Sequence, residues 1–322
     1  MLAIRAREAG GPDVLEAVQV DTPTPRPDQI LVRHHAIGVN FIDTYQRSGL
    51  YPMRYPAVLG QEAAGVVEAV GTDVSRFKPG DRVAYSGQGG AYAEYQVVPA
   101  VRAVPLPKEV GFEDAAASLL KGMTVEFLLR RCYPVKPGET ILVHAAAGGV
   151  GTIMVQWAKA IGAIVIGTVG SEEKAGVARG LGADHVILYR REDVAARVRE
   201  ITDGAGVPVA YDSVGKDTFE GTLASLARRG MFVTFGNASG PVPAFEPARL
   251  QRGGSLFLTR PTLADYIATP AELDESARQL FAMLGSGKVR VEIGQRFTLA
   301  DARKAHEALH ARDTIGATIL TP

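Results

Sequence analysis

Cysteine is nearly absent from this chain, since Cys132 is the single cysteine among 322 residues. An intramolecular disulfide is therefore excluded, and so is a metal site built from several thiolates. Long apolar runs are missing as well, because no uncharged stretch reaches the roughly 18 residues that a membrane helix needs. The start of the chain lacks the apolar run of a signal peptide. We expect a reduced, cytoplasmic protein without a membrane partner.

Net charge is also lacking, because 35 Lys and Arg residues balance 35 Asp and Glu residues. Without an excess of positive charge, binding to nucleic acid or to an anionic membrane is not expected. What is present is an ordinary globular composition, 46% hydrophobic and 22% charged. A chain of this length favours two domains.

The first 121 residues and the last 61 have the pattern of a β-rich domain. Short apolar runs at 30–33 and 64–70 are separated by Gly and Pro, and no long helical period occurs among the first hundred residues. The end of the chain predicts helices and strands in turn, at 271–284, 291–297, 299–309 and 318–320. We expect residues 1–121 and 262–322 to form one discontinuous domain.

Residues 122–261 follow a different pattern, in which apolar runs alternate with amphipathic stretches. The predicted strands are 141–143, 164–166, 186–188, 207–211, 231–233 and 255–258. Apolar residues recur at helical spacing from Val150 to Ile161, and Gly162 is a helix stop. Such alternation predicts a doubly wound parallel sheet of the Rossmann type, so the fold class is α/β.

A glycine-rich turn joins the first of these strands to the helix that follows. Free backbone N–H groups and the positive end of the helix dipole meet there, which suits a pyrophosphate. Gly148 would let the backbone approach the phosphates, and Gly151 would allow close helix–strand packing. Ala146 replaces the first glycine of the usual motif, so the alternative of a merely structural turn remains. The strand before and the helix after favour dinucleotide binding.

The end of the second strand indicates which dinucleotide. An NAD site usually has an acid there for the ribose 2′-hydroxyl, but this strand continues into Gly170 and Ser171. Ser171 and Lys174 would accept a 2′-phosphate, and Tyr189 would cover the adenosine. The alternative is that 172–174 is simply the first turn of an exposed helix, with its acids at the favourable end. The missing acid favours NADPH.

Several motifs along the chain carry a family resemblance. They lie at 36–43, 59–65, 80–83, 145–151, 212–215 and 235–237. With these motifs nearly the whole chain resembles the medium-chain dehydrogenase/reductase superfamily, and within it the zinc-free quinone oxidoreductase (zeta-crystallin-like) family. The resemblance implies a GroES-like catalytic domain beside the Rossmann domain at 122–261, which would bind NADPH.

The positions that bind the catalytic zinc in the alcohol dehydrogenases of that superfamily differ here. This chain has Asn40, Gln61 and Lys121 where those enzymes have Cys, His and Cys, and a counterpart of their cysteine-rich lobe is missing. Zinc needs thiolate, imidazole or carboxylate ligands. We therefore expect no metal, which disfavours alcohol–ketone exchange and favours a conjugated acceptor that delocalises the charge of the incoming hydride.

Two histidine patterns need a separate explanation. His306, Glu307 and His310 form a literal H-E-x-x-H, the zinc signature of metalloproteases, but no usual third ligand follows. We interpret this segment as a support helix of the catalytic domain. His34 and His35 are expected to alternate across a strand rather than to bind one ion.

The resemblance also implies the site residues. Asn40, Tyr45 and Tyr51 would line the substrate cleft as catalytic residues, with the stretch 43–51 expected to be an irregular loop over the active site. Aromatic faces suit a flat ring, and amide or hydroxyl groups suit its carbonyl oxygen; the alternative is that both tyrosines are packing residues. The predicted cofactor contacts are Asn40, Phe41, Tyr45, Thr124, Gly148, Gly149, Val150, Gly170, Ser171, Lys174, Tyr189, Ser213, Asn237 and Arg312.

The predicted function is NADPH-dependent reduction of a quinone without a metal. Hydride and single-electron transfer both remain open, and Tyr45 or solvent would supply the proton, since no His or carboxylate acid stands out. One alternative is a reductase of α,β-unsaturated carbonyls such as enals, enones or enoyl thioesters. Another is a protein that binds NADPH without turning it over. The resemblance implies a homodimer or homotetramer, joined near 255–258.

Overall fold

The computed structural model describes residues 1–312 and 314–322, which divide into two compact units. The first comprises Met1–Met123, Ile267–Ser286 and Val291–Pro322, and the second comprises Thr124–Tyr266 and Gly287–Arg290. One unit is built on a largely antiparallel sheet and the other on a parallel sheet. The predicted α/β fold class is therefore confirmed.

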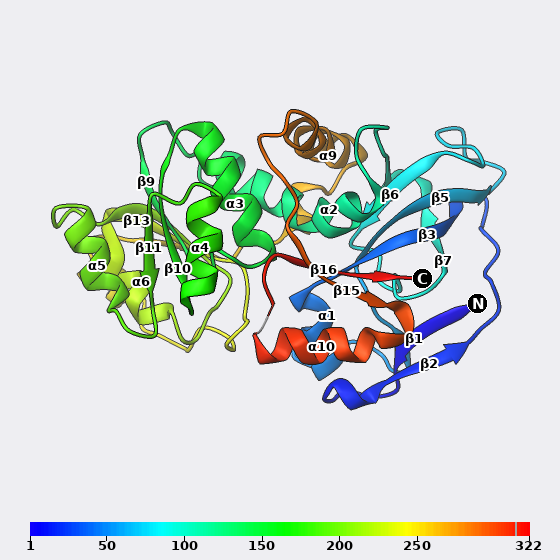
Figure 1. Ribbon diagram of the computed structural model, residues 1–322, viewed down its shortest axis with the longest axis horizontal. Coiled ribbons are helices and arrows are strands. Elements are labelled where there is room, and N and C mark those ends of the chain that lie inside the picture. The colour runs from blue at the N-terminus through cyan, green and yellow to red at the C-terminus, as the bar shows by residue number, and fades with distance from the viewer. Residues whose placement is uncertain (313) are drawn as a thin grey trace. The chain divides into compact units, whose positions relative to one another are not determined.

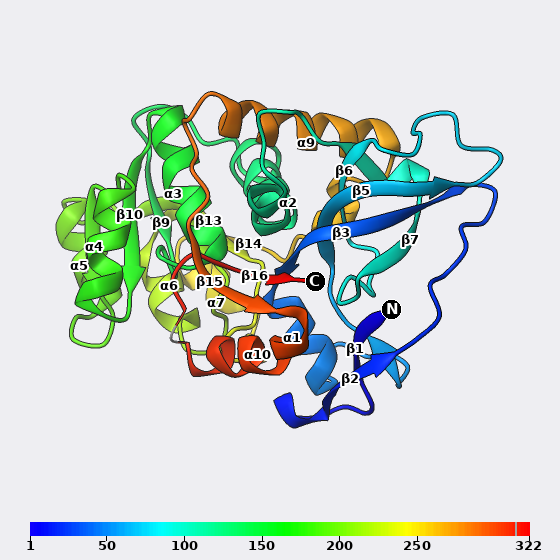
Figure 2. The same ribbon diagram turned by 45° about the vertical axis from the view of Figure 1, so that its right-hand side comes forward.

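The main sheet of the first unit has the order β15-β16-β3-β5-β6-β8, and β7 also pairs with β3. Its strands are β3 (Gln29–Val39), β5 (Glu62–Val70), β6 (Arg82–Ser86), β7 (Tyr95–Pro99), β8 (Ala103–Pro105), β15 (Ile293–Thr298) and β16 (Ala317–Thr321). A smaller sheet has the order β2-β1-β4, with β1 (Leu2–Ala6), β2 (Leu15–Gln19) and β4 (Ala57–Val58). The last strand of the chain thus lies antiparallel beside β3, with Thr318 opposite Val39, although the two are distant in the sequence (Figure 2).

The helices of the first unit pack against these sheets. They are α1 (Phe41–Ser48), the first part of α2 (Phe112–Phe127), α9 (Pro270–Gly285) and α10 (Ala302–Ala311), with short turns η1 (Pro12–Val14), η2 (Ala100–Arg102) and η4 (Leu299–Asp301). The core between them contains Ile30, Val32, Tyr85 and Tyr92. Alternation of buried and exposed residues in the middle of β3 fits a strand with one face on this core.

Residues 41–48 correct one prediction, because they form helix α1 rather than an irregular loop. Asn40 caps the helix, and its backbone N–H donates to the carboxylate of Asp43, three residues on, at 2.8 Å. Gly49 ends the helix in the left-handed region, with φ of 81°. The local signal for this helix is Asn-x-x-Asp at its start and a glycine at its C-terminal end.

Among the described residues, the second unit contains a parallel sheet of six strands in the order β11-β10-β9-β12-β13-β14. They are β9 (Thr140–Val143), β10 (Ile164–Val169), β11 (His185–Leu188), β12 (Val207–Asp212), β13 (Leu226–Thr234) and β14 (Phe257–Thr259). The helical segments are η3 (Leu128–Cys132), α3 (Gly149–Ile161), α4 (Glu172–Gly180), α5 (Val194–Ile201), α6 (Phe219–Ser225), α7 (Ala248–Arg252) and α8 (Leu263–Tyr266). In Figure 1, α3 and α4 lie on one side of this sheet and α5 and α6 on the other.

Each predicted strand of residues 122–261 overlaps a strand of this sheet. Strands β9 and β10 are short apolar runs with buried interiors, which is typical of a sheet covered on both faces. Gly162 ends α3 in the left-handed conformation, with φ of 97°. The carboxyl ends of the six parallel strands lie at one edge of the sheet, where doubly wound folds bind their ligands.

In the part of the chain that the structure describes, no helix is both long and apolar enough to cross a membrane.

Candidate active site

The first strand end of the second unit forms the glycine-rich turn. Ala145 adopts a φ of 54°, and Gly148 caps α3 in an extended conformation. A Cβ on Gly151 would lie 2.2 Å from the carbonyl oxygen of Ala145, so only glycine allows this approach of helix and turn. A Cβ on Gly148 would approach only Ala145, at 3.3 Å. The turn therefore leaves the amino end of α3 accessible to an anion.

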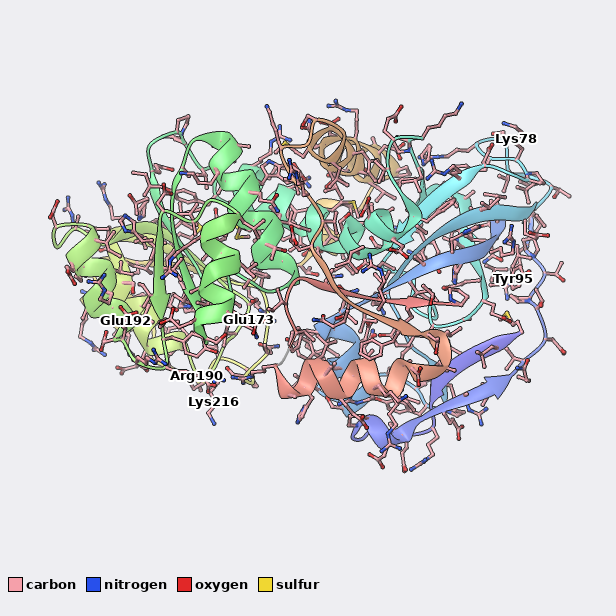
Figure 3. The ribbon with its side chains drawn as sticks, in the orientation of Figure 1. Lys78, Tyr95, Glu173, Arg190, Glu192 and Lys216 are labelled. Carbon is pink, nitrogen blue, oxygen red and sulfur yellow. The ribbon has the colours of Figure 1, made fainter. Side chains whose placement is uncertain are left out.

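The second and third strand ends bring four predicted cofactor residues together. Ser171 caps α4, and its hydroxyl accepts from the backbone N–H of Lys174 at 3.3 Å. A Cβ on Gly170 would lie 2.6 Å from the hydroxyl of Tyr189 and 3.5 Å from Nε of Arg190. Gly170, Ser171, Lys174 and Tyr189 thus form one cluster, which Arg190 joins. Figure 3 shows Arg190 at the lower edge of this unit, where the parallel strands end.

The ends of β12 and β13 also lie next to each other. The carboxylate of Asp212 accepts from the backbone N–H groups of Val214 and Gly215, which orders the turn after β12. A Cβ on Gly236 would lie 2.3 Å from the carbonyl oxygen of Ser213, so the two turns touch. Ser213 and the neighbour of Gly236, Asn237, are therefore close together. Thr124 stands apart from these turns in the sequence, on α2.

In the first unit, Asn40 belongs to a buried polar cluster. Its side-chain Nδ2 donates to Oε1 of Glu62 at 2.9 Å. The ammonium of Lys121 donates to the same oxygen at 2.7 Å, and the backbone N–H of Leu120 donates to Oε2 at 2.7 Å. Asn40 is 6% exposed, Lys121 5% and Glu62 0%. A buried carboxylate is tolerated here because it is paired and hydrogen-bonded on both oxygens.

The predicted substrate residues Tyr45 and Tyr51 lie close to Asn40 along α1. Their ring centroids are 5.3 Å apart in an edge-to-face arrangement, and Phe41 lies 6.3 Å from Tyr45. The backbone N–H of Tyr51 donates to the carbonyl oxygen of Tyr45 at 3.1 Å. The structure therefore gathers Asn40, Phe41, Tyr45 and Tyr51 on one helix and the turn that follows it.

A chain of hydrogen bonds, each with a defined donor and acceptor, links helix α1 to helix α10. Arg47 has only donors, so Nδ1 of His306 accepts from it, at 3.0 Å. The other ring nitrogen, Nε2, then carries the proton and donates to the hydroxyl of Tyr92 at 3.0 Å, and Tyr92 donates to Asp43 at 2.9 Å. Burial lowers the pKa of His306 to about 3, which agrees with a neutral ring.

Asp43 at the end of this chain is an unusual acid. Its Oδ2 accepts from Tyr92 and from the backbone of Asn40, whereas Oδ1 is buried without a hydrogen-bond partner among the residues that the structure describes. Burial raises the pKa of Asp43 from 3.8 to about 7, against the opposing effects of these two hydrogen bonds and of Lys121. The carboxyl group is thus set to titrate near neutral pH.

Replacing Asp43 with asparagine should therefore change how stability depends on pH. Between about pH 4 and about pH 7 the unfolded carboxyl is ionised while the native one keeps its proton, so the stability of the unmodified protein falls as pH rises. Asparagine has no such proton. The free energy of unfolding of Asp43→Asn relative to the unmodified protein should rise by about 1.4 kcal/mol per pH unit in this window, measured by urea denaturation. A difference independent of pH would show that the native carboxyl has an ordinary pKa.

The two histidine patterns behave as structural features. His34 is buried between the carbonyl oxygen of Ala93 at 2.6 Å and the hydroxyl of Tyr85 at 2.7 Å, while His35 is exposed and stacks on Phe112. Their predicted alternation across a strand is confirmed. In the H-E-x-x-H segment His306 is buried with both ring nitrogens engaged, and Glu307 and His310 are exposed.

The residues at the expected zinc positions do not suit a metal ion. The two that converge, Asn40 and Lys121, present an amide and an ammonium to Glu62, and Gln61 donates to the side chain of Gln46 at 2.9 Å. An ammonium repels a cation and cannot coordinate it. Within residues 1–312 and 314–322, no group of three or more His, Cys, Asp or Glu side chains is arranged to hold a metal.

The predicted site residues are distributed over both units. Asn40, Phe41, Tyr45, Tyr51 and Arg312 belong to the first, and the remainder to the second. Arg312 ends α10 in the left-handed region, with φ of 60°.

Three further residues of these clusters, Glu62, Asp43 and Arg190, were not among the predicted site residues. The first two are charges in otherwise apolar or helical segments, which is a signal for a buried polar network. Arg190 comes shortly after the end of strand β11.

The first unit also has a cavity of about 510 Å³. It is lined by side chains of β8 and α9, among them Val104, Asp274 and Phe281. Within the described chain no predicted site residue lines it, so it does not belong to the candidate site.

Comparison with known proteins places both units in one group. A family model described as "Alcohol dehydrogenase GroES-like domain" matches residues 26–108, and one described as "Zinc-binding dehydrogenase" matches residues 149–280. A quinone oxidoreductase from Pseudomonas aeruginosa is 54% identical over 315 residues, which is 97% of each chain. A 2-haloacrylate reductase from a Burkholderia species is 43% identical and covers 100% of this chain and 99% of its own.

A solved structure is similarly close. The crystal structure of the Escherichia coli quinone oxidoreductase complexed with NADPH is 49% identical, covers 100% of both chains and has a TM-score of 0.99.

Proposed function

The chain belongs to the quinone oxidoreductase family of the medium-chain dehydrogenase/reductase superfamily, and from this premise we propose that it reduces quinones with NADPH and without a metal. The observation that carries the proposal is a pair of features, one in each unit. The second unit has a helix amino end and an acid-free strand end suited to NADPH. The first has Asn40 and Lys121 where a zinc enzyme would need thiolates.

The residues at the strand ends fit NADPH. The pyrophosphate would lie at the amino end of α3, against the backbone of Gly148, Gly149 and Val150. The adenosine 2′-phosphate would lie between Ser171 and Lys174, with Tyr189 over the adenine. The other proposed cofactor contacts are Asn40, Phe41, Tyr45, Thr124, Gly170, Ser213, Asn237 and Arg312. We assign residues 122–261 to this NADPH domain and 1–121 with 262–322 to the catalytic domain.

The chemistry follows from what the first unit offers a flat, electron-poor ring. Bound NADPH supplies a hydride, and the acceptor gains negative charge on a carbonyl oxygen. Tyr45 and Tyr51 present aromatic faces to the ring, and the second N–H of the Asn40 amide can donate to that oxygen. A conjugated acceptor spreads its charge over the ring, so positioned donors suffice without a Lewis acid.

A second candidate activity is reduction of α,β-unsaturated carbonyl compounds. It is favoured by the 43% identity to a 2-haloacrylate reductase, which shares nearly the full length of the chain. The same donors would hold the carbonyl oxygen while hydride adds to the conjugated double bond.

The deciding experiment follows NADPH absorbance with the purified protein. A benzoquinone, an enone and an enoyl thioester are offered side by side, with a sample that lacks acceptor as control. Rapid oxidation with the benzoquinone supports the proposal, and faster oxidation with the enone or the thioester supports the second candidate. If NADPH binds, as seen by fluorescence, but no acceptor is turned over, the protein is a binder and the proposal is wrong.

Lys174→Glu is expected to raise the KM for NADPH much more than the KM for NADH, by about 10-fold or more, because only NADPH has the 2′-phosphate that the new carboxylate repels. Steady-state kinetics with both cofactors measures this. The matched control is Lys136→Glu, which makes the same charge change on an exposed loop. Lys136 precedes β9 and so lies at the amino ends of the parallel strands, whereas Lys174 follows the carboxyl end of β10. Equal effects on both cofactors would remove Lys174 from the phosphate site.

We also propose a cytoplasmic homodimer or homotetramer joined through the edge strand β14. This strand is last in the order of its sheet, and Phe257 on it is 56% exposed. Phe257→Lys should dissociate the assembly at micromolar concentration, as measured by sedimentation velocity, because an edge lysine opposes strand pairing. Val101→Lys, at a residue 52% exposed in the first unit, is the control. Unchanged sedimentation of Phe257→Lys would exclude β14 as the contact.

A further inference from the structure

One carboxylate organises three separate segments of the first unit. Oε1 of Glu62, on β5, accepts both from Nδ2 of Asn40 at the start of α1 and from the ammonium of Lys121 on α2. Oε2 accepts from the backbone N–H of Leu120 on the same helix. Both carboxylate oxygens are therefore engaged, and the group has one orientation.

Backbone packs closely against one side of the Glu62 carboxylate. A Cβ on Gly38 would lie 2.4 Å from Oε1 and 2.2 Å from the carbonyl oxygen of Ala116, so backbone closes that side. Glu62 is 0% exposed, and its charge is balanced by Lys121, whose side chain is 6% exposed. Removing either charge would leave the other uncompensated in a buried position.

This arrangement determines how the Asn40 amide is oriented. An ionised carboxylate has acceptors only, so the NH₂ group of Asn40 must face Glu62 and its carbonyl oxygen must point away. The backbone N–H of Asn40 is held independently by Asp43. Of the two side-chain N–H bonds of Asn40, one is used by Glu62 and the second keeps a fixed direction.

We propose that Lys121 is a positioning residue for hydride transfer. Its ammonium acts through Glu62 and holds the Asn40 amide so that the second N–H meets the carbonyl oxygen of the substrate. The inference rests on the proposed function, because the substrate role of Asn40 is assigned there. Lys121 itself need not touch the substrate.

The test is a double-mutant cycle in the full-length protein with NADPH and a benzoquinone. Lys121→Met should lower kcat by about 10- to 100-fold but raise the KM for NADPH by no more than about twofold, since Asn40 is one of many proposed cofactor contacts whereas its amide donor acts on the transition state. In the Asn40→Ala background the same substitution should lower kcat by less than about twofold, because no amide remains to be positioned. Lys159→Met, which removes a lysine paired with Asp184 in the second unit, should leave kcat unchanged.

Different failures point to different errors. If the effects of Lys121→Met and Asn40→Ala multiply, or if Asn40→Ala alone is harmless, Lys121 does not act through Asn40 and the inference is overturned. If the unmodified protein reduces neither quinone nor enone, the proposed function fails and the inference falls with it.

A second variant covers the case in which Lys121→Met does not fold, as judged by circular dichroism. The pair Lys121→Met with Glu62→Gln leaves no uncompensated charge, but a glutamine amide can present either its oxygen or its NH₂ group to Asn40. We expect kcat to fall by about 10-fold in this variant. Turnover at the level of the unmodified protein would overturn the inference.

Discussion

Replacing Lys121 with methionine is expected to lower the free energy of unfolding by about 3–5 kcal/mol, because the buried carboxyl group of Glu62 would lose its ion-pair partner. Both groups are almost fully buried, and the distance between Nζ and Oε1 is 2.7 Å. Methionine fills nearly the same volume, so the loss reports the charge and not a cavity. Urea denaturation followed by circular dichroism measures it.

Two comparisons make this result specific. Adding Glu62→Gln to Lys121→Met should restore most of the lost stability, since the double variant has neither of the two buried charges. Lys159→Met should cost no more than about 1 kcal/mol, because the pair of Lys159 and Asp184 is one-third exposed. If Lys121→Met and Lys159→Met were equally mild, the Glu62 site would be better hydrated than the structure indicates.

Gly151→Ala is expected to have the second large effect, on NADPH binding and on stability together. The added methyl group would meet the carbonyl oxygen of Ala145 at 2.2 Å and the backbone of Ala146 at 2.8 Å, neither of which can yield as a side chain could. The amino end of α3 must then move away from the turn. We expect a cost of about 1–3 kcal/mol in unfolding free energy and a rise of about 10-fold or more in the Kd for NADPH, measured by fluorescence titration.

Gly176→Ala is the matched control on the next helix. Apart from its chain neighbours and the backbone of its own helix, no heavy atom of the described residues lies within 4 Å of the position its Cβ would take, and the residue is inside α4. The substitution should stabilise the protein by roughly 0.5–1 kcal/mol through helix propensity and leave NADPH binding unchanged. If Gly151→Ala bound NADPH as tightly as Gly176→Ala does, the turn would not be the pyrophosphate site.

The parallel sheet was predictable because its signals are local. Each predicted strand is an apolar run bounded by Gly or polar residues, and such runs form β9 to β13 in the structure, with β9, β10 and β12 largely buried. The glycine turn was predictable for the same reason, since the strand, the turn and the helix are consecutive. Asp43 and Glu62 were not, because their roles depend on partners that are distant in the sequence.

Helix α1 shows where a local prediction went wrong. The stretch has two β-branched residues, Ile42 and Thr44, and only eight residues in all, so its helical propensity is weak. It is stabilised instead by the cap at Asn40, by Gly49 and by the buried contact of Arg47 with His306. The last of these joins positions 259 residues apart.

The amino-acid order alone determined the family, the α/β class, the glycine-rich turn at Gly148 and the absence of zinc ligands at Asn40, Gln61 and Lys121, because these depend on residue type and on near neighbours. Only the tertiary structure decided that Asn40 and Lys121 share one oxygen of Glu62, that Arg47 dictates the tautomer of His306, and that Arg190 lies beside Gly170. Chain folding brings these groups within hydrogen-bonding or van der Waals range. Burial then determines how strongly the charged groups interact.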